Sequence, residues 1–83
     1  MLYRSVQFFI RTWEGKTLNM SMRTCDTIED VMKKVEEKLQ LKESVHYLQY
    51  RGRVLSSGDT LEMHKVGRNS TIDIRLRNLG KLT

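Results

Sequence analysis

Apolar and polar residues alternate along two stretches near the start of the chain, residues 6–12 and 17–22. A period of two is typical of a strand with one buried face. The short sequence Glu14, Gly15 and Lys16 supplies a turn between the two stretches. We therefore expect an N-terminal β-hairpin. Its inward side chains would be Val6, Phe8 and Ile10 in the first strand, and Leu18, Met20 and Met22 in the second.

The period changes to that of a helix after residue 26. Thr27 is a suitable N-cap residue, and Asp30 lies at the third helical position, which is the spacing of a capping box. The carboxylate of Asp30 also suits the positive end of a helix. One apolar stripe then follows at helical spacing, formed by Ile28, Val31, Met32, Val35 and Leu39. We expect this stripe to pack on the inner face of the hairpin.

Strand-like alternation returns in residues 46–50 and again in residues 71–77. Between them, residues 51–53 (RGR) predict a turn, and residues 54–55 allow a very short return strand. The inward side chains would include His46, Ile72, Ile74 and Leu76. The order of strand, strand, helix, strand, short strand and strand is typical of an α+β domain with a helix across one sheet face.

Length and composition indicate one small domain. The chain has 83 residues, of which 39% are hydrophobic and 30% charged, without proline, as is typical of a folded module rather than a disordered segment. We expect a single domain over residues 1–83, with a core at about 6–78 and flexible ends at 1–5 and 79–83. A lone cysteine, Cys25, excludes an internal disulfide and favours a reducing compartment, cytoplasmic or nuclear. No apolar run approaches the ~18 residues of a membrane span, so no membrane partner is expected.

Several segments together resemble ubiquitin in order and register, from Val6 to about Gly80. They are GKTL at 15–18, DTIEDV at 26–31, LQYRGRVLSSGDTL at 48–61 and STIDIRLR at 70–77. The resemblance implies the β-grasp fold, a mixed sheet of four to five strands packed on one helix. In that fold Gly52 and Gly58 would lie in turns where glycine permits a positive φ. Three apolar side chains of this part of the chain would fill the core, namely Leu55, Leu61 and Val66.

Departures from ubiquitin bear on conjugation. Ubiquitin ends in a free diglycine, but here Lys81 follows Gly80, so we expect no attachment to targets. Arg11, Met32, Arg53 and Arg68 stand where ubiquitin has chain-forming lysines, and none of these side chains forms an isopeptide bond. Met32 replaces a largely buried lysine whose aspartate partner is also replaced, here by Ser57, and burial energetics favour losing both charges together.

The apolar recognition patch of ubiquitin is replaced as well. At the matching positions this chain has Trp13, Tyr47, Gln49, Asp73 and Arg75, with Arg77 kept beside them. The central isoleucine of ubiquitin thus becomes Gln49, which removes the apolar anchor for ubiquitin-binding helices. We expect an outward row of arginines instead, formed by Arg11, Arg53, Arg75 and Arg77, with Arg51 in the adjacent turn. Phe9, on the outward side of the first strand, is expected to be exposed and to form a second, smaller contact.

These features favour a non-conjugatable ubiquitin-like domain that binds proteins non-covalently as a monomer. By resemblance, it would link a parent protein to the ubiquitin, proteasome or chaperone machinery. The formal charge of +5 favours acidic partners. Two alternatives stay open: a basic domain that binds RNA or another polyanion through its arginines, and a modifier with atypical tail processing. No enzymatic activity, cofactor or metal is expected, because Cys25, His46 and His64 show no spacing typical of catalysis or metal binding.

Overall fold

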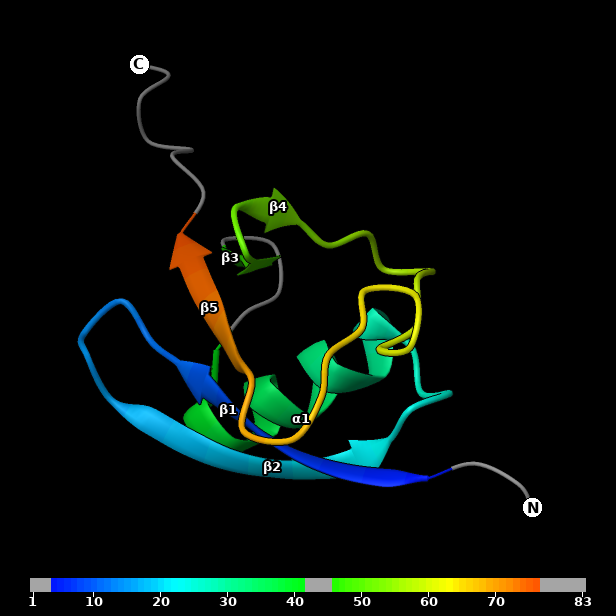
Figure 1. Cartoon of the computed structure of the whole chain (residues 1–83). Coiled ribbons are helices and arrows are strands. Elements are labelled where there is room, and N and C mark those ends of the chain that lie inside the picture. Colours follow the sequence, from blue (N-terminus) through cyan, green and yellow to red (C-terminus); the bar gives the residue numbers. More distant parts are fainter. Residues whose placement is uncertain (1–3, 42–45, 77–83) are drawn as a thin grey trace.

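The alternating stretches form five strands of one sheet, and the helical stripe lies across one face of it (Figure 1). The computed structural model describes residues 4–41 and 46–76. Its elements are β1 (Ser5–Arg11), β2 (Thr17–Arg23), α1 (Ile28–Leu39), β3 (His46–Tyr50), β4 (Arg53–Val54) and β5 (Thr71–Leu76). The strand order is β2-β1-β5-β3-β4. The pair β1–β5 is parallel and the other pairs are antiparallel, so the mixed sheet and single described helix are the expected β-grasp.

Strands β1, β2 and β4 differ from their expected bounds, and β2 does so by ending one residue later, at Arg23. Strand β1 begins one residue early, at Ser5, and ends at Arg11, because the hydroxyl of Thr12 bonds the following turn. Oγ1 of Thr12 accepts hydrogen bonds from the backbone N–H groups of Glu14 at 3.2 Å and Lys16 at 3.1 Å. Strand β4 comprises Arg53–Val54 rather than residues 54–55, so Arg53 lies in the strand and not in the turn.

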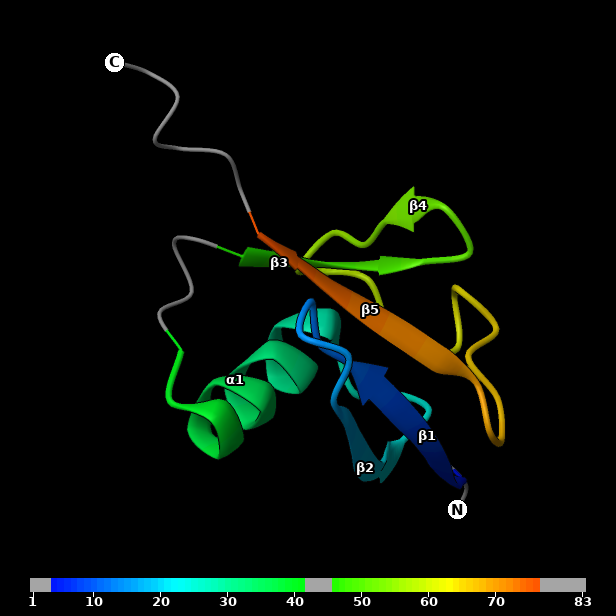
Figure 2. The same ribbon diagram turned by 90° about the vertical axis from the view of Figure 1, so that its left-hand side faces the viewer.

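Helix α1 begins with the capping box that the sequence predicts. The Thr27 hydroxyl accepts a bond from the Asp30 backbone N–H at 3.2 Å, and the Asp30 carboxylate accepts one from the Thr27 N–H, also at 3.2 Å. The helix ends at Gln40, which adopts the left-handed conformation and donates its N–H to Glu36 O. The apolar stripe faces the sheet, with Ile28, Val31 and Val35 buried, and Met32 and Leu39 partly buried against the core. Figure 2 shows the helix lying beside the twisted strands.

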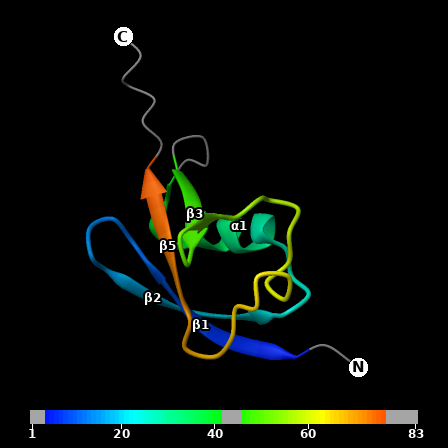
Figure 3. The same cartoon turned by 45° about the horizontal axis from the view of Figure 1, so that its top comes forward.

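The connection from β4 to β5 passes the N-terminal end of α1, where it satisfies otherwise unpaired helix N–H groups. The N–H of Ile28 donates to Asp59 O at 2.8 Å, and that of Glu29 donates to Ser57 O at 3.0 Å. Figure 3 shows this connection folded around the same end of the helix. The contacts anchor a long segment that has no strand or helix of its own among residues 55–70.

The buried leucines of this connection fill the core as expected. Leu55 is 6% exposed, Leu61 0% and Val66 3%. Gly52 has a φ of +81°, so the absence of a side chain is required there. Gly58 also lies in a turn, but the expectation of a positive φ is wrong at this position, because its backbone stays outside the left-handed region. Within the described residues, no helix is long and apolar enough to cross a membrane.

Candidate functional site

The sheet face opposite α1 carries the side chains that alternate with the core residues. Strand register sets their order, because directly paired residues point to the same side of a sheet. Arg11 on β1 pairs with Asp73 on β5, and Asp73 pairs with Gln49 on β3. One position along, Arg75 pairs with Tyr47. We call these five residues, together with Trp13 in the β1–β2 loop, the polar face.

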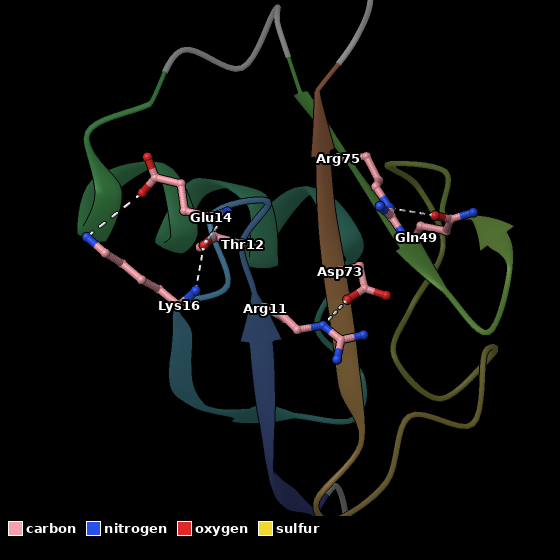
Figure 4. Close-up of polar contacts among 7 residues, drawn as sticks. All are labelled: Arg11, Thr12, Glu14, Lys16, Gln49, Asp73 and Arg75. Atoms are coloured by element: carbon pink, nitrogen blue, oxygen red, sulfur yellow. Dashed lines mark hydrogen bonds and ion pairs between the residues drawn. The ribbon is translucent and has the colours of Figure 1, made fainter.

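Two side-chain pairs hold the polar face together (Figure 4). Nε of Arg11 donates to Oδ1 of Asp73 at 2.8 Å, and Nε of Arg75 donates to Oε1 of Gln49 at 3.0 Å. The Arg11 side chain is 56% exposed and that of Asp73 is 23% exposed. Asp73 and Gln49 therefore occupy one nitrogen of each arginine, and the row is not a set of unpartnered cations.

Apolar groups flank the polar face instead of lying at its centre. Trp13 is 41% exposed, and it lies directly after the Thr12 that organises the β1–β2 turn. Val54 pairs with Gln49 and is 60% exposed, so it extends the polar face at the β4 edge. Sequence reasoning missed Val54, although the inward Leu55 that follows it indicates an outward Val54.

Arg53 does not belong to the expected arginine row. It pairs with Tyr50, whose ring is 7% exposed in the core, so Arg53 lies on the side of Tyr50. Successive residues of a strand point to opposite faces, so Arg53 lies on the face opposite to that of Val54 and Gln49 and not in the arginine row. Arg51 lies in the turn, with its guanidinium carbon 5.5 Å from the centre of the Tyr50 ring. Arg77 lies outside the described residues, as do Gly80 and Lys81.

Two further apolar positions differ from expectation. Phe9 is half-buried rather than exposed, because it lies between paired residues Asn19 on β2 and Thr71 on β5. The half-buried Phe9 side chain therefore offers less surface for the expected second contact. Leu76, expected to point inward, pairs with the buried His46 but is 47% exposed, because it lies at the end of β5 beyond the packed core.

Cys25, His46 and His64 lie in different surroundings. Cys25 is exposed in the connection before α1. His46 is buried, with Nε2 3.6 Å from a Glu36 carboxylate oxygen, whereas Nε2 of His64 lies 2.8 Å from Oδ2 of Asp59. Among the residues that the structure describes, no three His, Cys, Asp or Glu side chains are placed to hold a metal ion. The polar face presents side chains that can donate hydrogen bonds, from Arg11 and Arg75, and an exposed side chain that can pack, Trp13.

The chain is similar to known proteins over most of its length. The family model for the ubiquitin family matches residues 8–79. Ubiquitin-like protein 4A of Xenopus tropicalis is 28% identical over 72 residues, which make up 87% of this chain and 49% of that protein. The chain thus spans about half the length of this relative. Among solved structures, a de novo protein designed on the basis of ubiquitin matches with a TM-score of 0.82 and 31% identity, covering 89% of this chain and 90% of the other.

Proposed function

The chain belongs to the ubiquitin family, and from this premise we propose that it is a non-conjugated interaction module that binds partner proteins through the polar face. The observation that carries the proposal is the pairing of Arg75 with Gln49 at 3.0 Å. Together these side chains put a hydrogen-bonded polar pair at the centre of the face. A partner that inserts an aliphatic side chain there would bury both groups without new hydrogen bonds, at about 1–3 kcal/mol each.

The polar face suits a partner with carboxylates and a large apolar side chain. The hydrogen bonds within the described chain use only Nε of Arg11 and Arg75, which leaves their Nη groups for an incoming carboxylate. Charge-assisted bonds of this kind are among the stronger hydrogen bonds in proteins. Trp13 and Val54 at the margins supply apolar contact area. The preferred ligand is thus an acidic protein segment with an aromatic or aliphatic anchor.

The face can be tested by restoring aliphatic residues at its centre. We expect an isolated helical ubiquitin-interacting peptide to bind the native domain poorly, and Gln49→Ile combined with Arg75→Val to increase its affinity about tenfold, since about 1.4 kcal/mol is recovered. NMR titration measures both affinities and shows which residues shift. Lys34→Val, on the exposed side of α1, is the control for a general increase in apolar surface. Native binding as strong as that of the double variant would contradict the proposal.

We further propose that the domain is not attached to target lysines. The sequence Gly80–Lys81 in place of a diglycine supports this, because a lysine side chain obstructs the narrow channels through which a conjugating tail passes. The assay is incubation with a ubiquitin-family activating enzyme and ATP, with ubiquitin as the positive control. A thioester between this chain and the enzyme would overturn the proposal.

As a module, the domain would link a parent protein to the ubiquitin, proteasome or chaperone machinery. As a free protein, it would bind the same machinery directly. Its match to about half of a longer ubiquitin-like relative supports a modular role. Its single cysteine fits a reducing compartment, cytoplasmic or nuclear. Pull-down with the native domain and with the Gln49→Ile/Arg75→Val variant would identify the partners that depend on the polar face. The modular role predicts proteins of that machinery among them, and their absence would count against it.

A further inference from the structure

A second surface lies beside the β3–β4 turn, on the side of the sheet that Arg53 shares with Tyr50. It is a hollow of about 420 Å³ lined by Tyr50, Arg51, Arg53, Met63, His64 and Lys65. The turn supplies Arg51 and strand β4 supplies Arg53. The connection before β5 supplies Met63, His64 and Lys65, which lie around the Tyr50 side chain. We call it the basic hollow. It is separate from the polar face, whose residues do not line it.

Positive charge predominates among the residues that line the basic hollow. Arg51, Arg53 and Lys65 are exposed, and none forms an ion pair with another described residue. The carboxylate of Asp59 is bonded to His64 at 2.8 Å, and no acidic side chain is among the lining residues. Like charges held around one hollow repel each other and attract an anionic ligand.

The backbone holds two of these cations in an unfavourable conformation. Arg51 has a φ of 54° and Lys65 a φ of 55°, a region that glycine and asparagine adopt more easily than long side chains. Two of the four non-glycine residues with a positive φ in the described part of the chain thus line the same hollow, from two separate segments.

The hollow also contains apolar surface, but its lining offers no exposed aromatic ring on which a nucleobase could stack. Met63 is 63% exposed at its margin, which suits contact with an apolar side chain of a ligand. The Tyr50 ring is 7% exposed, and the guanidinium of Arg51 lies over it at 5.5 Å. A nucleobase therefore finds no open aromatic face, which sequence-tolerant binding of single strands requires.

From these observations we propose that the basic hollow binds an acidic peptide segment of a partner protein, with carboxylates on Arg51, Arg53 and Lys65 and an apolar side chain against Met63. This site goes beyond the polar face and does not depend on it. The ligand is a run of glutamate or aspartate residues interrupted by one leucine or methionine. Each carboxylate gains charge-assisted hydrogen bonds and relieves repulsion among the cations.

The probe is a fluorescein-labelled peptide of six residues, Glu-Asp-Leu-Glu-Asp-Glu, measured by fluorescence anisotropy and by NMR shifts. The test variant is Arg51→Gly/Arg53→Gln/Lys65→Asn. Glycine and asparagine favour the left-handed backbone at the two strained positions, so this variant should fold at least as well as the native chain, which thermal unfolding checks. The control variant Lys34→Gln/Lys38→Gln/Arg68→Gln removes the same charge from exposed residues outside the hollow.

We expect the test variant to lose at least about tenfold in affinity, and the control variant less than about threefold, since screened surface charge contributes little. The NMR chemical-shift changes that the peptide causes in the native chain should centre on the residues of the hollow. The same changes should persist in the Gln49→Ile/Arg75→Val variant, because this variant alters only the polar face. Equal losses in the test and control variants would overturn the proposal, as would undetectable binding to the native chain. A single-stranded oligonucleotide of equal charge that binds the hollow more tightly than the peptide would also overturn it.

Discussion

The ion pair between Arg11 and Asp73 should stabilise the fold only slightly. The two residues are paired neighbours on β1 and β5, with Nε 2.8 Å from Oδ1. Two unit charges about 4 Å apart attract by about 1 kcal/mol when water dominates their surroundings. The Arg11 side chain is 56% exposed, which places the pair near that limit, and ordering the long side chain offsets part of the gain. We therefore expect a coupling free energy of about 0.5 kcal/mol.

A double-mutant cycle isolates this coupling. The native chain, Arg11→Ala, Asp73→Ala and the double variant are unfolded with urea and followed by circular dichroism, at low salt and at about 1 M salt. The coupling should fall towards zero at high salt, where the Debye length is about 3 Å. A coupling above about 2 kcal/mol, or one that salt does not change, would refute the assignment of Arg11 and Asp73 to a solvated pair.

Three further predictions concern the scaffold, each measured as the free energy of unfolding in urea. Thr27→Ala removes one of the two capping-box bonds of α1 and should cost about 1 kcal/mol; no loss would contradict the cap. Leu61→Ala empties a fully buried core position and should cost about 3 kcal/mol, whereas a loss below about 1 kcal/mol would show that the connection repacks. Gly52→Ala, at a φ of +81°, should cost about 1 kcal/mol. Gly58→Ala should be neutral or stabilising, because the added Cβ has open space around it and the φ at this position is outside the left-handed region.

Local sequence signals were sufficient for most of the fold. The capping box at Thr27 and Asp30 and the apolar stripe of α1 depend on neighbours within four residues, so their periodicity was readable directly. Strand β3 has the expected bounds for the same reason, because its five residues alternate. The ubiquitin resemblance added the mixed sheet, whose parallel pairing of β1 with β5 across the length of the chain has no local signature.

The candidate site was less predictable because it depends on register and on partners from other strands. A strand of two residues, Arg53–Val54, carries too little alternation to set its side, so Arg53 was placed with the wrong neighbours and Val54 was overlooked. The bond between Arg75 and Gln49 joins residues that are 26 positions apart. The basic hollow escaped notice for a similar reason, since Arg51 and Lys65 meet only after the connection has folded back.

The basic hollow and the polar face would act on a partner in different ways, the first by attracting it and the second by selecting it. On the polar face, Arg11 and Arg75 contribute two positive charges and Asp73 one negative charge, so the net charge is +1. Around the basic hollow, Arg51, Arg53 and Lys65 contribute +3, and the nearby Asp59 lowers this to +2. Attraction over distance acts on net charge, so it should direct an acidic partner to the hollow first. Selection at the polar face acts at short range, where a partner carboxylate either bonds the Nη groups of Arg11 and Arg75, which the contacts within the chain leave available, or displaces Asp73 from Arg11. If that pair contributes about 0.5 kcal/mol, the displacement lowers affinity by only a factor of two to three. A well-placed carboxylate regains this loss through its own bonds to Arg11, whereas an aliphatic group makes no such bond.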